Sequence, residues 1–195
     1  MNNTVYQTFR GLINLCCLRA SPADLPYSTV MLVLLIIIEL GLNIFTLSQL
    51  KGAPLAQVIL ASALSLIVLI GLTYVFLSQR KVPARLYKVL IAWFGTELLL
   101  TMVLKVLLMI IPESMQATKV VQAVLQVAFF TWNVAIKAYI IRRSCDIKLV
   151  SALLTTFGIL IVSSLPIQFI LGAYIPQALP ETVPESSPES SSQSE

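Results

Sequence analysis

Five long apolar segments constrain this chain more than any other feature of its sequence. They cover about residues 27–49, 55–78, 87–111, 118–141 and 149–173 of the 195-residue chain. A helix needs roughly 20 mostly apolar residues to cross the hydrocarbon core of a bilayer, and each segment is long enough. None of them alternates polar and apolar residues as the strands of an outer-membrane barrel do. The sequence therefore predicts an all-α polytopic membrane protein, a bundle of five transmembrane helices.

The composition argues against an enzyme. The chain is 57% hydrophobic and 11% charged, whereas a typical soluble domain is about 25% charged. It has no histidine, and its three cysteines show no CxxC spacing, so we expect free thiols. HExxH, GxSxG and Walker motifs are absent, as are paired aspartates. We therefore expect no catalytic residue, no metal site and no cofactor.

The basic residues predict how the spans are oriented. The N-terminal segment and the loops after the second and fourth spans hold nine cations: Arg10, Arg19, Arg80, Lys81, Arg85, Lys88, Arg142, Arg143 and Lys148. The other two loops hold only Lys51 and Lys119, and the tail holds none. Because cytoplasmic loops carry the excess of Lys and Arg, we expect a cytoplasmic N-terminus and a C-terminus on the other side.

The two ends of the chain differ from the membrane domain, residues 27–173. The leader, residues 1–26, carries an apolar helical face: Val5, Phe9, Leu12, Ile13 and Cys16. This spacing predicts an interfacial amphipathic helix on the cytoplasmic surface, the alternative being a disordered leader. The tail, residues 174–195, is rich in Pro, Glu and Ser and is predicted to be disordered because it cannot bury enough apolar surface.

Polar side chains inside the spans are the candidate functional residues. At 1.5 Å per residue, Glu39, Glu97 and Asn133 lie about 18, 14 and 13 Å from the cytoplasmic ends of their spans, which predicts one shared layer. An ionisable group at such a depth costs at least about 2.5–3.5 kcal/mol, so it faces protein or water. With their neighbours on the same helical faces they form the predicted intramembrane polar cluster: Glu39, Asn43, Glu97, Thr101, Gln122, Gln126 and Asn133.

The remaining intramembrane features have simpler explanations. Lys105 lies near the outer edge and Lys137 near the cytoplasmic edge, so we expect both lysines to extend toward the lipid headgroups. The second and fifth spans carry small residues, which let helix backbones approach closely. These small residues are Ala61, Ser62, Ser65, Gly71, Ser151, Thr155, Gly158, Ser163 and Ser164.

Three hypotheses explain the polar cluster. It supports packing between helices, with both glutamates protonated and paired to Asn or Thr. Alternatively, it is a docking surface for another membrane protein. In the third hypothesis, Glu39 and Glu97 are protonatable groups on a path for protons or a small solute. Neither an inverted repeat nor a pair of Gly/Pro-broken helices supports transport.

The overall pattern resembles that of a known superfamily. An amphipathic leader, the stretch "LRASPADLPYS", five closely spaced spans and the stretch "WFGTELLLTMV" resemble the Yip1-like superfamily, and more narrowly small inner-membrane proteins of Gram-negative bacteria. The short motifs of the eukaryotic family are absent, so no trafficking role through small GTPases is implied. The resemblance implies a non-enzymatic adaptor or assembly factor of the cell inner membrane, with a periplasmic C-terminus.

The expected partners follow from this interpretation. We expect contacts with membrane lipid and with a membrane protein partner or a second copy of the chain, and none with nucleic acid. The alternative function is that of a small transporter or proton-conducting component that uses Glu39 and Glu97.

Overall fold

A computed structural model describes residues 2–25, 28–49, 53–110 and 116–174. Its elements are α1 (Asn2–Cys16), η1 (Pro22–Asp24), α2 (Thr29–Leu47), α3 (Leu55–Gln79), η2 (Pro83–Arg85), α4 (Leu86–Ile110), α5 (Gln116–Cys145), α6 (Leu149–Leu171) and η3 (Gly172–Tyr174). The described part of the chain contains no strand, and α2 to α6 are long and apolar enough to cross a membrane. The predicted all-α fold with five spans is confirmed, and the chain is a multi-pass membrane protein.

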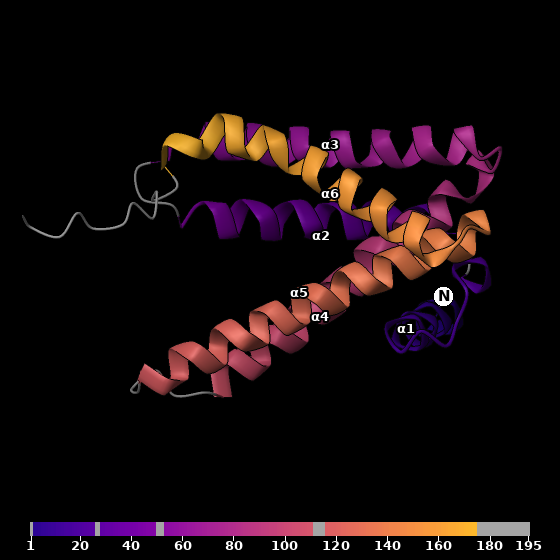
Figure 1. Cartoon of the computed structure of the whole chain (residues 1–195), viewed down its shortest axis with the longest axis horizontal. Helices are drawn as coiled ribbons and strands as arrows, with labels where there is room; N and C mark the ends of the chain where they lie inside the picture. The colour runs from indigo at the N-terminus through magenta and orange to yellow at the C-terminus, as the bar shows by residue number, and fades with distance from the viewer. Residues whose placement is uncertain (1, 26–27, 50–52, 111–115, 175–195) are drawn as a thin grey trace, which may run out of the picture.

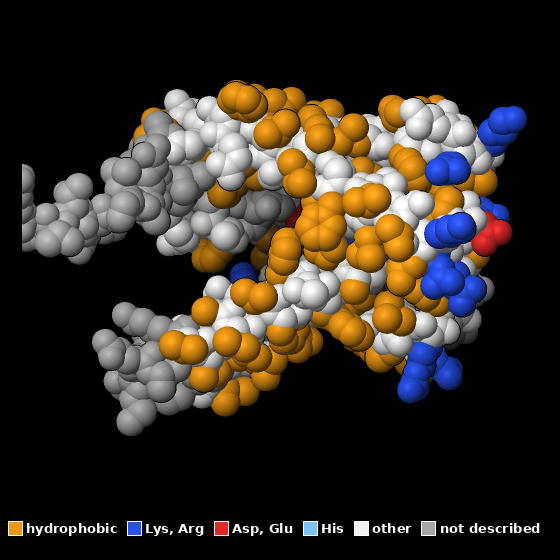
Figure 2. Space-filling model, viewed as in Figure 1, with side chains coloured by type: hydrophobic (Ala, Val, Ile, Leu, Met, Phe, Trp, Pro, Cys, Tyr) orange, Lys and Arg blue, Asp and Glu red, His pale blue; other side chains and the backbone are white. Residues whose placement is uncertain are grey.

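The five spans form two groups that meet at one end and diverge at the other. Helices α2, α3 and α6 form the first group, and α4 and α5 run side by side as the second (Figure 1). The groups meet where the α3–α4 and α5–α6 connections lie, and Figure 2 shows Lys and Arg gathered there. We call this the basic end, and the opposite end, where the groups diverge, the open end.

Three helices finish at the basic end with the same backbone motif. Leu18, Lys81 and Asp146 follow α1, α3 and α5 and adopt left-handed φ angles of 58°, 60° and 52°. The next amide in each case donates back to the carbonyl five residues earlier, at 2.8 Å (Arg19 to Asn14), 3.0 Å (Val82 to Leu77) and 3.4 Å (Ile147 to Arg142). This is the Schellman arrangement, which usually places glycine at the left-handed position. Here Leu, Lys and Asp residues adopt the left-handed conformation instead of glycine, and the chain turns sharply at each helix end.

The packed core occupies the half of the bundle near the basic end. All eight residues 89–96 of α4 are buried, among them Trp93 and Phe94, and most of residues 134–144 of α5 are buried as well. Toward the open end, residues 98–110 of α4 and 120–133 of α5 include no fully buried residue. The second helix group therefore packs tightly on the rest of the bundle over only half of its length.

Helix α1 docks on the bundle at the basic end. It is seen nearly end-on in Figure 1, where the five spans run across the view, so it lies across the bundle. Its buried side chains are Thr8, Leu12 and Leu15, and a Cβ added to Gly95 of α4 would lie 2.6 Å from Cδ1 of Leu12. The leader is helical, as its periodicity predicts. Its predicted apolar face, however, packs on the protein in one part and is exposed in another.

The apolar face of α1 meets two kinds of surroundings. Leu12 packs against α4, whereas Phe9 and Ile13 are 51% and 44% exposed. The side chain of Val5 lies outside the described residues. Because neighbours on a helix point about 100° apart, one broad apolar face can contact α4 on one side and lipid on the other.

Small residues bring α3 and α6 together, as predicted, but only in part. Ala61, Ser62 and Ser163 are buried, and the Ser65 hydroxyl donates to the carbonyl oxygen of Ser163 at 2.5 Å. The expectation of close packing at the glycines is wrong. A Cβ added to Gly71 or to Gly158 would meet no atom within 4 Å, because both residues lie on exposed helix faces. The predicted disordered tail lies outside the described residues from 175 onward.

Candidate functional site

An ion pair between α4 and α5 lies deep in the bundle. Nζ of Lys137 is 2.8 Å from Oε2 of Glu97, and the two side chains are 4% and 27% exposed. The same ammonium group lies 5.1 Å from the centroid of the Trp93 ring, on its face. A carboxylate and an aromatic face together compensate a buried ammonium group for its lost hydration. The side chain of Lys137, which belongs to α5, is therefore held against α4.

Two expectations are corrected by this pair. Lys137 does not extend to the headgroups, because a carboxylate and a ring face are available one helix away and its side chain is buried against them. Glu97 is paired with the Lys137 ammonium group and not with an amide. Lys105, by contrast, is exposed near the open end, where its Nζ lies 5.8 Å from the centroid of the Phe45 ring.

Glu39 faces the same region from α2. The Asn43 side-chain amide donates to Oε1 of Glu39 at 2.9 Å and to the backbone carbonyl of Glu39 at 3.0 Å. A spacing of four residues places both side chains on one face of the helix, which is why they meet. This contact agrees with the expected pairing of a glutamate with an asparagine. Within the described ranges, no Lys or Arg lies within ion-pair distance of Glu39.

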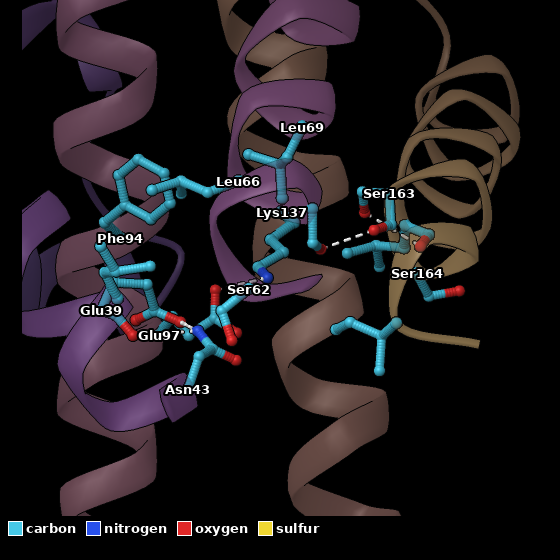
Figure 3. Close-up of a pocket in the computed structure, with 14 residues that line it drawn as sticks. Glu39, Asn43, Ser62, Leu66, Leu69, Phe94, Glu97, Lys137, Ser163 and Ser164 are labelled. Carbon is cyan, nitrogen blue, oxygen red and sulfur yellow. Dashed lines mark hydrogen bonds and ion pairs between the residues drawn. The ribbon is translucent and has the colours of Figure 1, made fainter. Parts of the chain in front are cut away.

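All five spans contribute to a cavity of about 200 Å³ around these groups (Figure 3). Its polar lining residues are Glu39, Asn43, Ser62, Ser65, Glu97, Lys137, Ser163 and Ser164. The four serines, which the sequence suggests only as packing residues, thus also line the cavity. Five separate helices hold this site, so its geometry depends on the whole bundle.

A second cavity, of about 180 Å³, extends the first one toward the open end. It shares Glu39, Asn43 and Glu97 with the first cavity and adds Thr46, Thr101 and Lys105. We call the two cavities together the polar crevice. Figure 2 shows the hollow between the two helix groups, with acidic and basic side chains inside it. The crevice thus leads from the Lys137–Glu97 pair to the wider separation of the helices.

The predicted polar cluster is divided by α4 into two parts. Asn133 and Gln126 line a separate cavity of about 180 Å³ between α4 and α5, and neither lines the crevice. Thr101 lines both this cavity and the crevice, whereas Gln122, half-buried on α5, lines none of the three. Asn133 thus does not meet Glu39 and Glu97 in one cavity, because equal depth does not place side chains on the same side of a helix.

The deep part of the crevice has an unbalanced set of ionisable groups. It contains two carboxyl groups, Glu39 and Glu97, but only the ammonium group of Lys137. Lys137 is paired with Glu97. Glu39 therefore has to carry a proton, or its carboxylate has to be compensated by a cation or a partner. No group of three or more His, Cys, Asp or Glu side chains able to hold a metal occurs among the described residues.

Comparison with protein families, with curated proteins and with solved structures finds no match to this chain. The functional argument therefore rests on the geometry of the crevice and on the faces of the helices around it.

Proposed function

We propose that this protein is a non-enzymatic adaptor or assembly factor of the cell inner membrane, and that it receives a transmembrane segment of a partner protein at its open end. The observation that carries the proposal is the unpacked outer half of α4 and α5. Residues 98–110 and 120–133 include no fully buried residue, yet polar side chains such as Thr101, Gln126 and Asn133 lie along them.

Among the described residues, these polar groups lack sufficient partners. Oδ1 of Asn133 is buried and accepts no hydrogen bond from a described residue, and the side chain of Gln126 is exposed. An unpaired buried acceptor costs about 1–3 kcal/mol, and lipid offers it no donor. A partner helix that carries Ser, Thr, Asn or Gln would satisfy such groups, since these residues hydrogen-bond between helices in membranes.

The location supports the same proposal. The cations at the basic end favour a cytoplasmic N-terminus, because Lys and Arg are retained on the cytoplasmic side. The open end then faces the periplasm, and the resemblance to Yip1-like inner-membrane proteins is in keeping with this placement. A partner segment would enter the outer leaflet half of the bundle, where α4 and α5 diverge from α2, α3 and α6.

Affinity purification in mild detergent, followed by mass spectrometry, tests the proposal. We expect one membrane protein to copurify with the wild-type chain in a fixed ratio and to be lost from the Gln126→Leu/Asn133→Leu variant. The matched control is Gln168→Leu, which changes an exposed glutamine on α6 and should keep the partner. A chain that purifies alone, or a partner that is retained by the double variant, contradicts the proposal.

A second candidate function is a path for protons or a small solute. The observation that favours it is Glu39, which lines the cavity while no described Lys or Arg lies within ion-pair distance of it. In liposomes that carry a pH gradient, this function requires faster decay of the gradient with the wild-type protein than with the Glu39→Gln variant. Gradient decay no faster than in protein-free liposomes excludes proton conduction.

A further inference from the structure

A separate charged pocket lies at the basic end of the bundle. This cavity of about 150 Å³ lies between η1, the region around the start of α4 and the end of α5. Its charged lining residues are Arg85, Lys88 and Arg143, and none of its lining residues is acidic. It shares no residue with the polar crevice, so an inference about it does not depend on the proposed function.

Each cation of this pocket is held in place by a neutral acceptor. Arg85 Nη1 donates to the carbonyl oxygen of Ser144 at 2.7 Å, and Lys88 Nζ donates to that of Ala23 at 2.5 Å. Nε of Arg143 donates to the Tyr139 hydroxyl at 3.2 Å. These bonds orient the side chains, and all three acceptors are neutral. No ion pair involves any of the three among the described residues.

The remaining hydrogen-bond donors point to the ligand. A guanidinium group has five N–H donors and an ammonium group has three, so the bonds above use only a few of the donors of the three side chains. Three neighbouring cations repel one another unless an anion lies between them. A phosphate group suits such a site, because its oxygens accept several charge-assisted hydrogen bonds, in pairs from arginine.

The place of the pocket identifies the source of the phosphate. α4 begins and α5 ends beside it, which puts it at the level where a span leaves the hydrocarbon and meets headgroups. Its apolar wall includes Val89 and Pro22, both buried. Basic pockets between transmembrane helices on the cytoplasmic side bind the headgroups of anionic lipids.

We propose that Arg85, Lys88 and Arg143 bind the phosphate of an anionic phospholipid in the leaflet at the basic end. The bound lipid would join three segments that are far apart in the sequence: η1, the η2–α4 region and the end of α5. Because η1 follows α1 directly, the lipid would also hold the leader helix close to the spans. The class of ligand is thus a phosphodiester with a net negative charge and two acyl chains.

Native mass spectrometry of the full chain in neutral detergent tests the proposal, with phosphatidylglycerol or phosphatidylcholine added. We expect one phosphatidylglycerol to be retained by the wild-type protein and its affinity to fall at least tenfold in Arg143→Gln. The hydrogen bond of Arg143 to Tyr139 stays within α5, so this variant should fold normally. Arg85→Gln is the second variant and should show the same loss of affinity.

The matched control is Arg80→Gln/Lys81→Gln, which removes charge at the same end without changing a lining residue of the pocket. Equal loss of phosphatidylglycerol in this control would show a diffuse surface effect and overturn the proposal. Equal retention of phosphatidylcholine would overturn it as well. If inorganic phosphate at millimolar concentration displaces the lipid, the phosphate site is supported. If phosphate stabilises the protein where phosphatidylglycerol does not, the lipid as the source is wrong.

Discussion

At the scale of single residues, the buried Lys137–Glu97 pair is the most sensitive feature of the bundle. Removing one member of a buried ion pair leaves an uncompensated charge, which costs about 3–5 kcal/mol. We therefore expect Lys137→Met to lower the unfolding temperature in detergent and the amount of protein that accumulates in membranes. Lys105→Met changes an exposed lysine and serves as the control, with almost no expected effect.

The partner residue allows a sharper version of the same experiment. Glu97→Gln should destabilise the protein while Glu97→Asp keeps the charge and retains more stability. The double variant Glu97→Gln/Lys137→Met should recover most of the loss, because no buried charge then remains unpaired. If Glu97→Gln unfolds at the wild-type temperature, the ion pair does not support the fold, and the hypothesis of a protonated, hydrogen-bonded glutamate regains its place.

The thiol of Cys16 gives a prediction in terms of pH. Burial, and secondly the neighbouring Cys17, raise the pKa of this thiol to about 11. Only the thiolate reacts with maleimide, so in a Cys17→Ala/Cys145→Ser background we expect slow labelling at pH 8. The rate should rise roughly tenfold per pH unit until the pH approaches this pKa. Labelling that saturates below pH 9 would show that Cys16 is not buried.

The same thiol makes the stability of the protein depend on pH. In the unfolded chain a cysteine ionises near pH 8.5, whereas folded Cys16 keeps its proton to a higher pH. The folded state therefore binds more protons between these two values, and its stability falls as the pH rises through this window. Below about pH 8 the thiol has no such effect, since it is protonated in both states.

The position of Lys137 shows where residue-level prediction stops. Counting residues along a helix gives its depth, but the long lysine stem reaches either the headgroups or a neighbouring helix from that depth. The choice depends on Glu97 and Trp93, which approach it from another helix. The predicted meeting of Asn133 with the two glutamates is not found for a related reason, because depth alone does not tell on which side of α4 a side chain lies.

At the scale of elements, the contact between α1 and α4 depends on the missing side chain of Gly95. A Cβ at this position would lie within 2.8 Å of both Cδ atoms of Leu12, closer than packed carbon atoms allow. Overpacking of this kind costs about 1–3 kcal/mol. We expect Gly95→Ala to loosen α1 and to speed tryptic cleavage at Arg10 and Arg19 in vesicles that expose the basic end.

Gly71→Ala is the matched control for this prediction. Its Cβ would meet no atom within 4 Å, and alanine favours a helix interior by roughly 0.5–1 kcal/mol over glycine. This variant should therefore be cleaved no faster than the wild-type protein. Equal cleavage rates in the Gly95→Ala and wild-type proteins would mean that Leu12 adjusts without releasing α1.

The spans themselves are well predicted, whereas their neighbours are not. Their predicted bounds agree with α2 to α6 to within a few residues, because the length of an apolar run is set by the thickness of the bilayer. The pairing of the helices depends on side-chain contacts that a single sequence does not reveal. Gly71 and Gly158 look like packing glycines but face outward, while Gly95 makes the close approach.

At the scale of the whole molecule, the charge distribution predicts its orientation. If the positive-inside tendency holds for this chain, the basic end lies in the cytoplasm and the C-terminus on the opposite, periplasmic side. A reporter enzyme that is active only in the periplasm should therefore be active when fused after Glu195. The same reporter fused after Lys148, in the loop before α6, should be inactive. The opposite pair of results would reverse the orientation and move the open end to the cytoplasmic side.

The contact of Leu12 with Gly95 also fixes an order of events during synthesis. The ribosome makes α1 before α4, so the docking surface of α1 does not exist until α2 and α3, two complete spans, have been made. During that interval Leu12 and Leu15 have no protein to pack against, and the membrane surface is the apolar environment within reach. Helix α1 can therefore reach its packed position only after α4, the third of the five spans, has been made.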